Sequence, residues 1–486
     1  MTRHSTWKRW SAVLVLCAAT AIAAQGQTFT SLFDFAGTNG AYPWKMSLVQ
    51  GVDGNLYGTT QLGGDLWGLC GNGCGTVFRI TSAGTVVSSH LTAADGSAPV
   101  AGLVLATNGS LYGTTELGGA NNGGTIFVVD TKNGKVTVLY NFCAQPNCAD
   151  GQEPDGTLIQ AADGALYGTT SSGGANYCQG YGGCGTIFRV TPEGKLTTLY
   201  NFCSQTNCTD GSGPGAGLVQ GADGDFYGTT EAGGDPANDG TVFKITAAGT
   251  LTTLHTFDGT DGSGPSSWLV QGTDGDFYGT TVVSGDFGLG TIFKITSAGG
   301  LTTLYTFCTQ NGCPDGGRPY VGLVQGTDGN FYGTTYTLGL YGGGTVFEIT
   351  PTGTLTTLHA FAGPDGFEPL GGLVQATSGT FYGTTVQGGS CASRYGCGTV
   401  FTLSMGLDPF VSFVRNPAKV GQMFGVLGQG FTGTTSVSLN GIPATFSVKS
   451  DTLIEATVPQ RATTGYVTVT TPSGTLTSNV PFHVIK

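Results

Sequence analysis

Two glutamates stand where the chain departs from its own repeat. Glu116 and Glu231 directly follow a Tyr-Gly-Thr-Thr segment, where the other copies of this segment are followed by Gln61, Ser171, Val282, Tyr336 or Val386. Residues present in every copy favour a structural role, so function is expected where the copies differ. Two carboxyl groups facing one cleft, about 5–10 Å apart, can act as acid and base on a glycan. Solvated loop acids are the alternative. Because no Ser-His-Asp or Cys-His pairing is evident, no catalytic residue is assigned.

Aromatic and basic side chains also break the repeat, in loops predicted to share one face of the protein. They are Trp44, Trp67, Tyr177, Tyr181, Trp268, Arg318, Tyr320, Tyr341, Arg394 and Tyr395. Rigid loops that carry exposed rings are the usual form of a binding surface, and sugar rings stack well on such side chains. The alternative is that each ring packs under its own loop. The predicted ligand-binding residues are Trp67, Trp268, Arg318, Tyr320, Glu116 and Glu231.

Twelve cysteines form six close pairs along the chain. The pairs are Cys70 with Cys74, Cys143 with Cys148, Cys178 with Cys184, Cys203 with Cys208, Cys308 with Cys313, and Cys391 with Cys397. A repeat that lacks one partner lacks both, which predicts six local disulfides in an exported chain. Each closes a short loop and contributes about 2 kcal/mol. Zinc held by two converging pairs is the alternative, and no metal or cofactor is predicted.

The elements that must position these residues come from a repeat. Tyr-Gly-Thr-Thr occurs seven times, beginning at Tyr57, Tyr112, Tyr167, Tyr227, Tyr278, Tyr332 and Tyr382. Residues 213–257 serve as the type unit, with four short β-patterned segments joined by turns, which is the pattern of a propeller blade. Seven fourth strands are found, offset by one repeat. We therefore expect Phe29–Phe35 to pair with Thr399–Ser404 and close the ring.

Histidines and Asp-Gly steps fit the repeat as structural features. His90, His255 and His359 are aligned with Tyr140, Tyr200 and Tyr305 of sister repeats, so we interpret them as aromatic fillers of the outer strand. Asp-Gly steps recur at Asp95, Asp150, Asp210, Asp261, Asp315 and Asp365. Turn chemistry explains them better than calcium, because no repeat gathers several acids at calcium-loop spacing.

The repeat resembles the GloVer tandem repeat of exported bacterial proteins. The resemblance rests on Gly-Leu-Val-Gln, Asp-Gly-x-Phe-Tyr-Gly-Thr-Thr, Gly-Gly and Gly-Thr-Val-Phe-x-Ile-Thr, and covers about residues 28 to 404. It implies a secreted or surface location and no known reaction. The family often carries a C-terminal sorting segment, and this chain departs from it by having no apolar-plus-basic tail.

A different pattern begins at Asp408. Several short strands and an Asn440-Gly441 hairpin turn predict an immunoglobulin-like β-sandwich over residues 408–486. The stretch resembles the IPT/TIG family. The matching segments include Gly428-Gln429-Gly430-Phe431, Val437-Ser438-Leu439-Asn440-Gly441, Ala444-Thr445-Phe446, Ser450-Asp451-Thr452-Leu453-Ile454, Thr457-Val458-Pro459 and Gly465-Tyr466-Val467-Thr468-Val469. The family implies a spacer or interaction module.

The N-terminus and the net charge bear on location and partners. Residues 1–24 combine a basic start, a short apolar run and small residues at a cleavage position, which is typical of a signal peptide. Its removal takes away Arg3, Lys8 and Arg9, so the net charge becomes more negative than the −12 of the full chain. An acidic surface repels phosphate backbones, which argues against nucleic acid. No transmembrane span is predicted.

Together these features predict an all-β protein, a seven-bladed β-propeller over residues 28–405 followed by an immunoglobulin-like sandwich. We expect a monomeric binding or scaffold protein, extracellular or in the cell envelope, that recognises a glycan or a surface protein through its disulfide-loop face. The alternative function is an extracellular carbohydrate-active enzyme, a glycoside hydrolase or lyase.

Overall fold

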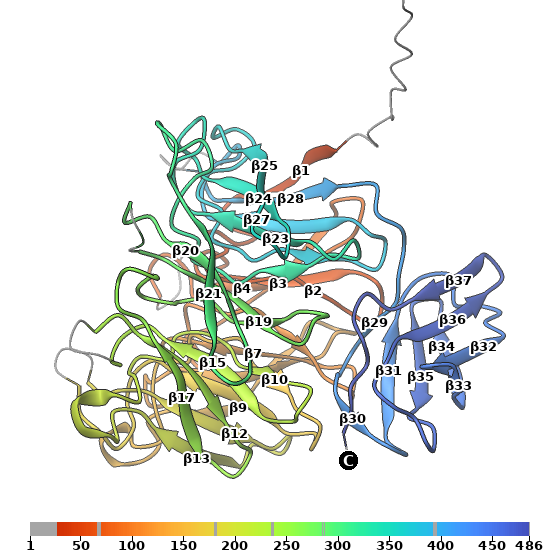
Figure 1. Cartoon of the computed structure of the whole chain (residues 1–486), viewed down its shortest axis with the longest axis horizontal. Helices are drawn as coiled ribbons and strands as arrows, with labels where there is room; N and C mark the ends of the chain where they lie inside the picture. The colour runs from red at the N-terminus through yellow and green to blue at the C-terminus, as the bar shows by residue number, and fades with distance from the viewer. Residues whose placement is uncertain are drawn as a thin grey trace, which may run out of the picture.

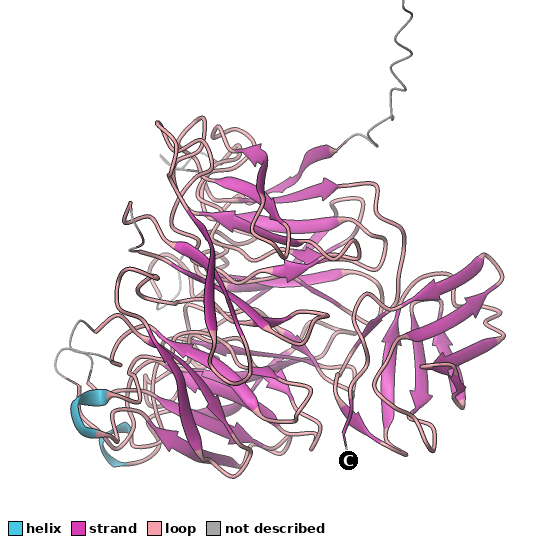
Figure 2. Cartoon of the chain, viewed as in Figure 1, coloured by secondary structure: helices cyan, strands magenta, loops and turns pink. Residues whose placement is uncertain are grey.

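The computed structural model of the chain describes residues 27–65, 70–178, 182–234, 238–283, 285, 287–391 and 396–485. These residues form an all-β protein in which seven four-stranded antiparallel sheets are the blades of a propeller, followed by further C-terminal sheets (Figure 1). Figure 2 shows helix only at two short turns, η1 (Pro146–Cys148) and η2 (Thr206–Cys208). None of the described helices has the length and hydropathy needed to cross a bilayer. The predicted signal peptide lies outside the described residues.

Each blade uses its four strands in the same order from the ring centre outward. The first strands are β2 (Val49–Gln50), β6 (Val104–Leu105), β10 (Ile159–Gln160), β14 (Val219–Gln220), β18 (Val270–Gln271), β22 (Val324–Gln325) and β26 (Val374–Gln375). The second strands are β3 (Leu56–Thr60), β7 (Leu111–Thr115), β11 (Leu166–Thr170), β15 (Phe226–Thr230), β19 (Phe277–Thr281), β23 (Phe331–Thr335) and β27 (Phe381–Thr385). The third strands are β4 (Thr76–Ile80), β8 (Thr125–Val129), β12 (Thr186–Val190), β16 (Thr241–Ile245), β20 (Thr291–Ile295), β24 (Thr345–Ile349) and β28 (Thr399–Ser404). The fourth strands are β5 (Val86–His90), β9 (Val136–Asn141), β13 (Leu196–Asn201), β17 (Leu251–Thr256), β21 (Leu301–Thr306), β25 (Leu355–Ala360) and β1 (Thr28–Asp34).

The chain alternates between two faces of the ring. The first-to-second and third-to-fourth connections are short turns on one side, which we call the hairpin face. The second-to-third loops and the blade-to-blade connections lie on the other side, which we call the loop face. Blades are numbered 1 to 7 by their first strands, from β2 to β26.

The Tyr-Gly-Thr-Thr segment is the buried second strand of every blade. In blade 4, Tyr227 donates a hydrogen bond to Asp223 in the preceding turn (2.7 Å). Thr229 donates to the Ser267 carbonyl of the next blade (3.0 Å). A Cβ on the intervening glycine would collide with the Phe243 ring of the third strand. The segment therefore bonds and packs the blades, which confirms the structural role predicted for it.

A glutamine at the end of the first strand joins neighbouring blades everywhere except in blade 2. Gln220 donates to the Gly224 carbonyl of its own turn (2.8 Å) and accepts from the Ala162 N–H of the preceding blade (3.2 Å). The same two bonds are made by Gln50, Gln160, Gln271, Gln325 and Gln375. Blade 2 has Leu105 at this position, buried in one apolar cluster with Leu427 of the C-terminal sheets.

The N-terminal strand closes the ring. β1 pairs antiparallel with β28, from Thr28 opposite Ser404 to Asp34 opposite Thr399. The Phe29 ring stacks on His359 of blade 6, with centroids 3.6 Å apart. The predicted closure is confirmed, and blade 7 gains an outer strand that would otherwise leave an open sheet edge.

The outer strand of blade 1 differs from the other six. In those six blades the fourth strand has a register shift against the third, and the residue left over at the shift is a leucine, such as Leu254 in blade 4. β5 is one residue shorter than β17, has no shift and pairs His90 with Thr76. The predicted alignment of His90 with Tyr140 is therefore wrong, because loss of the bulge residue moves the ring one position along the strand. Ser89 takes that position.

The other two histidines do replace tyrosines. His255 Nε2 lies 2.6 Å from Asp261 Oδ2, and Tyr140 donates to Asp150 over 2.8 Å in the same way. His359 and Asp365 form the matching pair in blade 6 (2.7 Å). These aspartates belong to the Asp-Gly steps, and five of the six steps bond to the outer strand of their own blade as turn residues. The exception is Asp95, which bonds to Thr92 just after β5.

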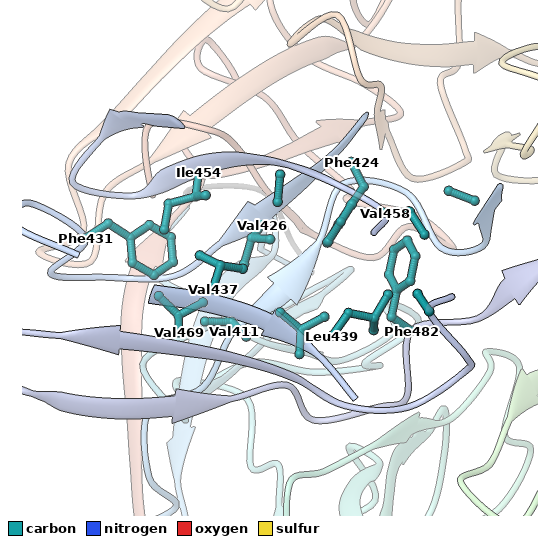
Figure 3. Close-up of a cluster of buried hydrophobic side chains, with 14 residues drawn as sticks. Val411, Phe424, Val426, Phe431, Val437, Leu439, Ile454, Val458, Val469 and Phe482 are labelled. Carbon is teal, nitrogen blue, oxygen red and sulfur yellow. The ribbon is translucent and has the colours of Figure 1, made fainter. Parts of the chain in front are cut away.

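The C-terminal strands form a two-sheet sandwich. One sheet has the order β29 (Ser412–Phe413), β31 (Met423–Leu427), β35 (Leu453–Thr457) and β34 (Phe446–Ser450). The other has the order β33 (Ile442–Pro443), β32 (Ser436–Leu439), β36 (Val467–Thr471) and β37 (Gly474–Thr477). A short parallel pair joins β30 (Ala418–Lys419) to β38 (Val484–Ile485). Alternating apolar side chains of both sheets fill the core, including Phe424, Val437 and Phe482 (Figure 3). The predicted Asn440-Gly441 turn joins β32 to β33.

The sandwich is docked on the hairpin face of the propeller. Thr452 donates to the Val52 carbonyl in the first turn of blade 1 (2.6 Å). Phe410 N–H donates to the Thr377 carbonyl in the corresponding turn of blade 7 (3.0 Å). A cavity of about 270 Å³ lies between Phe413 and the inner strands of blades 1, 2, 3 and 7. The sandwich therefore covers the ring centre on this face and leaves the loop face free.

Candidate functional site

The centre of the loop face is built on one backbone device repeated in all seven blades. A proline precedes each first strand, and the residue before that proline has a left-handed φ between 54° and 62°. These residues are Tyr42, Ala98, Glu153, Gly213, Gly264, Arg318 and Glu368. Five of them are not glycine, and non-glycine residues adopt this conformation only when the surrounding structure imposes it.

In each blade, the left-handed residue before the proline also fixes the residue that follows Tyr-Gly-Thr-Thr. Its carbonyl accepts a hydrogen bond from the N–H of the residue after the second threonine, over 2.9 to 3.3 Å. In blade 2 this bond runs from Glu116 to Ala98, and in blade 4 from Glu231 to Gly213. The backbone of the repeat therefore holds both predicted glutamates at the centre of the loop face, which we call the mouth of the ring.

Residues from five blades close this mouth. Lys45, Asp155, Gly215, Trp268 and Tyr320 line a space of only about 10 Å³ with their neighbours. The mouth is thus a packed surface rather than an open channel. A ligand would rest on this surface, and Trp268 and Tyr320 are half-buried within it.

Trp268 fits because its counterparts are small. The residue just before the Leu-Val or Leu-Ile pair that leads into each first strand is Ser47, Gly102, Thr157, Gly217, Trp268, Gly322 or Gly372. A Cβ on Gly322 or Gly372 would collide with the indole. The Trp268 ring therefore lies across the backbones of blades 6 and 7, which makes it a fixed part of the mouth.

Carboxylates from three blades face one ammonium at the mouth. Lys45 extends from blade 1 to blade 4, where its Nζ lies 3.6 Å from Glu231 Oε1. Burial raises the pKa of Asp155 to about 7, with the nearby Glu116 carboxylate adding to the rise and Lys45 opposing it. Burial, followed by the charge of Glu153, also raises the pKa of Glu116. The site is thus acidic, and the Asp155 carboxyl group is only partly ionised at neutral pH.

Asp155 is the least satisfied polar group in this cluster. Its Oδ1 is buried and has no hydrogen-bond partner among the described residues. A buried unpartnered oxygen is costly and stands out where a ligand can supply a donor. The three acids do not converge closely enough to appear as a metal-ligand group. Within the described residues, such a group is found only for Cys178, Cys203 and Cys208.

A second polar group lies on the blade 6 side of the mouth. The Tyr320 and Tyr336 rings meet edge to face, with centroids 5.4 Å apart. Burial and the charge of Glu368 raise the pKa of Tyr336, and Arg318 opposes the rise. Arg318 is exposed at its left-handed position.

The structure places the predicted site residues as follows. Glu116, Glu231, Trp268 and Tyr320 come together at the mouth, and Arg318 lies at its edge. Trp67 lies outside the described residues, as do Tyr181, Arg394 and Tyr395. Four further residues of the mouth were not among those predicted, namely Lys45, Glu153, Asp155 and Glu368. Their signal was available, because all four lie within two residues of the proline before a first strand, where the repeats also differ.

Exposed apolar side chains gather on the same face. Of the large apolar side chains exposed on the described propeller, only Val87 lies elsewhere. The others lie in second-to-third loops and are Leu117 (41%), Tyr177 (75%), Val283 (36%), Phe287 (53%), Leu340 (70%) and Tyr341 (62%). Loops that expose rings around a packed centre have the make-up of an interaction surface.

All six predicted disulfides form in the structure, each within one loop of the loop face. They join Cys70 to Cys74, Cys143 to Cys148, Cys178 to Cys184, Cys203 to Cys208, Cys308 to Cys313, and Cys391 to Cys397. In the three second-to-third loops the second cysteine of the pair is buried, which is Cys74, Cys184 or Cys397. These three bridges therefore fasten their loops to the blade beneath.

The bridges of the blade-to-blade connections have a different backbone. Both cysteines of each pair adopt a left-handed φ, between 47° at Cys313 and 65° at Cys308. Non-glycine residues adopt this conformation only when it is imposed, so each bridge occurs with a tight, specific turn. These bridges stiffen the connections that surround the mouth.

The zinc alternative depended on two converging cysteine pairs. Blade 3 carries two bridges side by side, and the sulfurs of Cys178, Cys203 and Cys208 lie within 4.8 Å of one another. The convergence is thus present in blade 3, with these sulfurs bonded as disulfides.

Comparison with known proteins gives the fold and the family. A fungal alcohol oxidase of the AA5 family, solved in complex with copper, has a TM-score of 0.50 at 14% identity, covering 94% of this chain and 99% of that chain. An oligogalacturonate lyase from Vibrio parahaemolyticus has a TM-score of 0.45 at 10% identity, covering 77% of this chain and 93% of that chain. No curated protein matches the chain. The Gloeobacter/Verrucomicrobia repeat model matches residues 18–179, 67–273 and 249–436, well over half of the sequence, and the chain therefore belongs to this repeat family.

Proposed function

We propose that this protein is an exported binding protein that recognises carbohydrate on its loop face. One observation carries the proposal. Exposed apolar side chains and the residues that break the repeat occupy the same face, around an acidic mouth. Sugar C–H faces stack on rings such as Tyr177 and Tyr341, and sugar hydroxyls donate hydrogen bonds to carboxylates such as Glu231.

Export and a monomeric state belong to the same proposal. The composition of residues 1–24 and the six disulfides support a secreted or cell-envelope location. We assign the C-terminal sandwich to the IPT/TIG type, acting as a spacer. Its docking on the hairpin face supports this role, because it leaves the loop face free for a ligand.

The test is a glycan array probed with the purified protein and with Tyr177→Ala and Tyr341→Ala. We expect binding to one glycan class, reduced at least tenfold in the double variant, since one stacked ring contributes about 1 kcal/mol. Tyr466→Ala is the matched control, because Tyr466 is an exposed ring on the sandwich (44%). Absence of glycan binding, or equal loss in the control, would overturn the proposal.

Asp155 favours a second candidate function, a glycan-cleaving enzyme. A carboxyl group with a pKa near 7 can donate a proton at neutral pH, and the nearby Glu231 carboxylate could serve as its partner. A hydrolysis and lyase screen on any bound glycan distinguishes the two functions. Turnover that Asp155→Asn abolishes while binding persists would establish the enzyme.

A further inference from the structure

The joint between blades 1 and 2 contains a cavity at a place where a bulge leucine packs in other joints. In blades 2 to 5, the carbonyl of the bulge leucine lies against the turn glycine of the next blade. Leu139 meets Gly194 in this way, and Leu199 meets Gly249. Blade 1 lacks the bulge and the leucine, and the Ser89 side chain faces Gly134 instead. A serine is much smaller than a leucine, so a cavity of about 170 Å³ remains.

The walls of this cavity are apolar with a cationic edge. Val77, Phe78, Val87 and Val129 line it, together with Lys132 and Arg79. Val87 is 55% exposed, although sister blades have threonine at the same register, such as Thr252 opposite Lys244. An apolar side chain thus replaces a polar one where the leucine is missing.

The cationic side chains at the edge of the cavity favour a negatively charged ligand. Lys132 has no carboxylate within ion-pair distance among the described residues, and Arg79 lies 3.9 Å from Asp53. In blade 4, Lys244 stands at the position of Arg79 and is held by two aspartates at 2.8 and 2.9 Å. The joint between blades 1 and 2 therefore has a cationic side chain, Lys132, without an ion-pair partner among the described residues, beside a largely apolar cavity.

We propose that this joint binds a small amphipathic carboxylate, whose aliphatic or aromatic part occupies the place of the missing leucine while its carboxylate pairs with Lys132. A dry cavity of about 150 Å³ holds an apolar group the size of benzene. The site lies between outer strands, away from the mouth, and does not depend on the proposed function of the loop face.

The experiment is saturation-transfer NMR on the purified protein with hexanoate as the probe and hexylamine as the charge-reversed comparison. Hexanoate is expected to receive saturation and hexylamine is not. Ser89→Leu, or a leucine inserted between Ser88 and Ser89, fills the hole and abolishes the signal while raising Tm by about 1–3 °C. Ser88→Leu is the matched control, because Ser88 is the adjacent residue and does not line the cavity.

Charge reversal tests the anionic part separately. Lys132→Glu is expected to weaken hexanoate binding at least tenfold. A hexanoate signal that survives Ser89→Leu would place binding elsewhere and overturn the site. Equal binding of hexanoate and hexylamine, or an unaffected Lys132→Glu variant, would overturn the ligand class.

Discussion

The hairpin face and the loop face share the same strands but not the same freedom to vary. On the hairpin face, short turns repeat nearly unchanged around the ring, and the sandwich is docked across them. On the loop face, the connections vary in length and carry the disulfides, the exposed rings and the charges of the mouth. A tight turn dictates its residues, whereas a longer loop with fixed ends accepts many. Chemistry therefore gathers on one side of a symmetric scaffold.

Removing Thr28–Asp34 should have the largest effect, because this strand closes the ring on which both faces depend. The deletion opens blade 7 and removes the packing of Phe29, Leu32 and Phe33. We expect a loss on the order of 5 kcal/mol in the free energy of unfolding, or failure to fold. Thermal unfolding followed by near-UV circular dichroism measures it. Thr30→Ala, at an exposed position of the same strand, is the control and should retain wild-type stability.

Leu427→Asp should act on the hairpin face alone. Leu427 is 5% exposed and packs in the cluster of Leu105, so a carboxylate there would be buried without a partner. We expect about 3 kcal/mol of destabilisation and faster proteolysis between residues 405 and 411. Tyr466→Asp is the control on the exposed side of the sandwich. Equal stability of the two variants would mean that the docked contact contributes nothing.

The pH dependence of the free energy of unfolding should report on the buried carboxyl group of Asp155 at the mouth of the loop face. The pKa of Asp155 is about 7 in the folded chain, above the value of about 3.9 for an unfolded aspartate. The folded state then binds the extra proton between about pH 4 and pH 7, so stability is present below this window and is lost as pH rises through it. We expect a loss on the order of 4 kcal/mol from this group, absent in Asp155→Asn. Denaturant titrations at several pH values measure it, with Asp408→Asn as the exposed control. An unchanged pH profile in Asp155→Asn would contradict the shift.

Replacing Cys178 and Cys184 by serine should have the smallest global effect. The loop that this bridge closes is short, so we expect at most about 2 kcal/mol. Hydrogen exchange should rise in the loops of blade 3 and stay unchanged in the hairpin turns. Peptide mapping without reduction checks the bridge itself. Free thiols at these positions in the wild-type protein would contradict the pairing.

Much of the fold could be predicted from the sequence because the same strand and turn patterns occur seven times. Asp-Gly turns, β-branched strands and the offset of the fourth strands led to seven blades and to closure by Phe29–Phe35. The alignment of His90 failed, because a single missing residue in β5 shows only when strand register is known. Trp268 and Tyr320 were selected by their departure from the repeat. Asp155 and Lys45 were not selected, although they also lie beside prolines where the repeats differ, because only the closed ring shows that these positions meet at its centre.

The sequence by itself determined the blade, the number of blades, the pairing of the cysteines and the residues that differ between repeats. Each of these depends on local spacing or on counting, and neither requires knowledge of distant contacts. Only the tertiary structure decided that Glu116, Asp155 and Glu231 lie near one ammonium, because ring closure brings the inner ends of separate blades to one axis. It also decided that the sandwich covers the hairpin face and that the blade 1–2 joint is hollow. Burial and charge at these places arise from neighbours far away in the chain, and no local pattern encodes them.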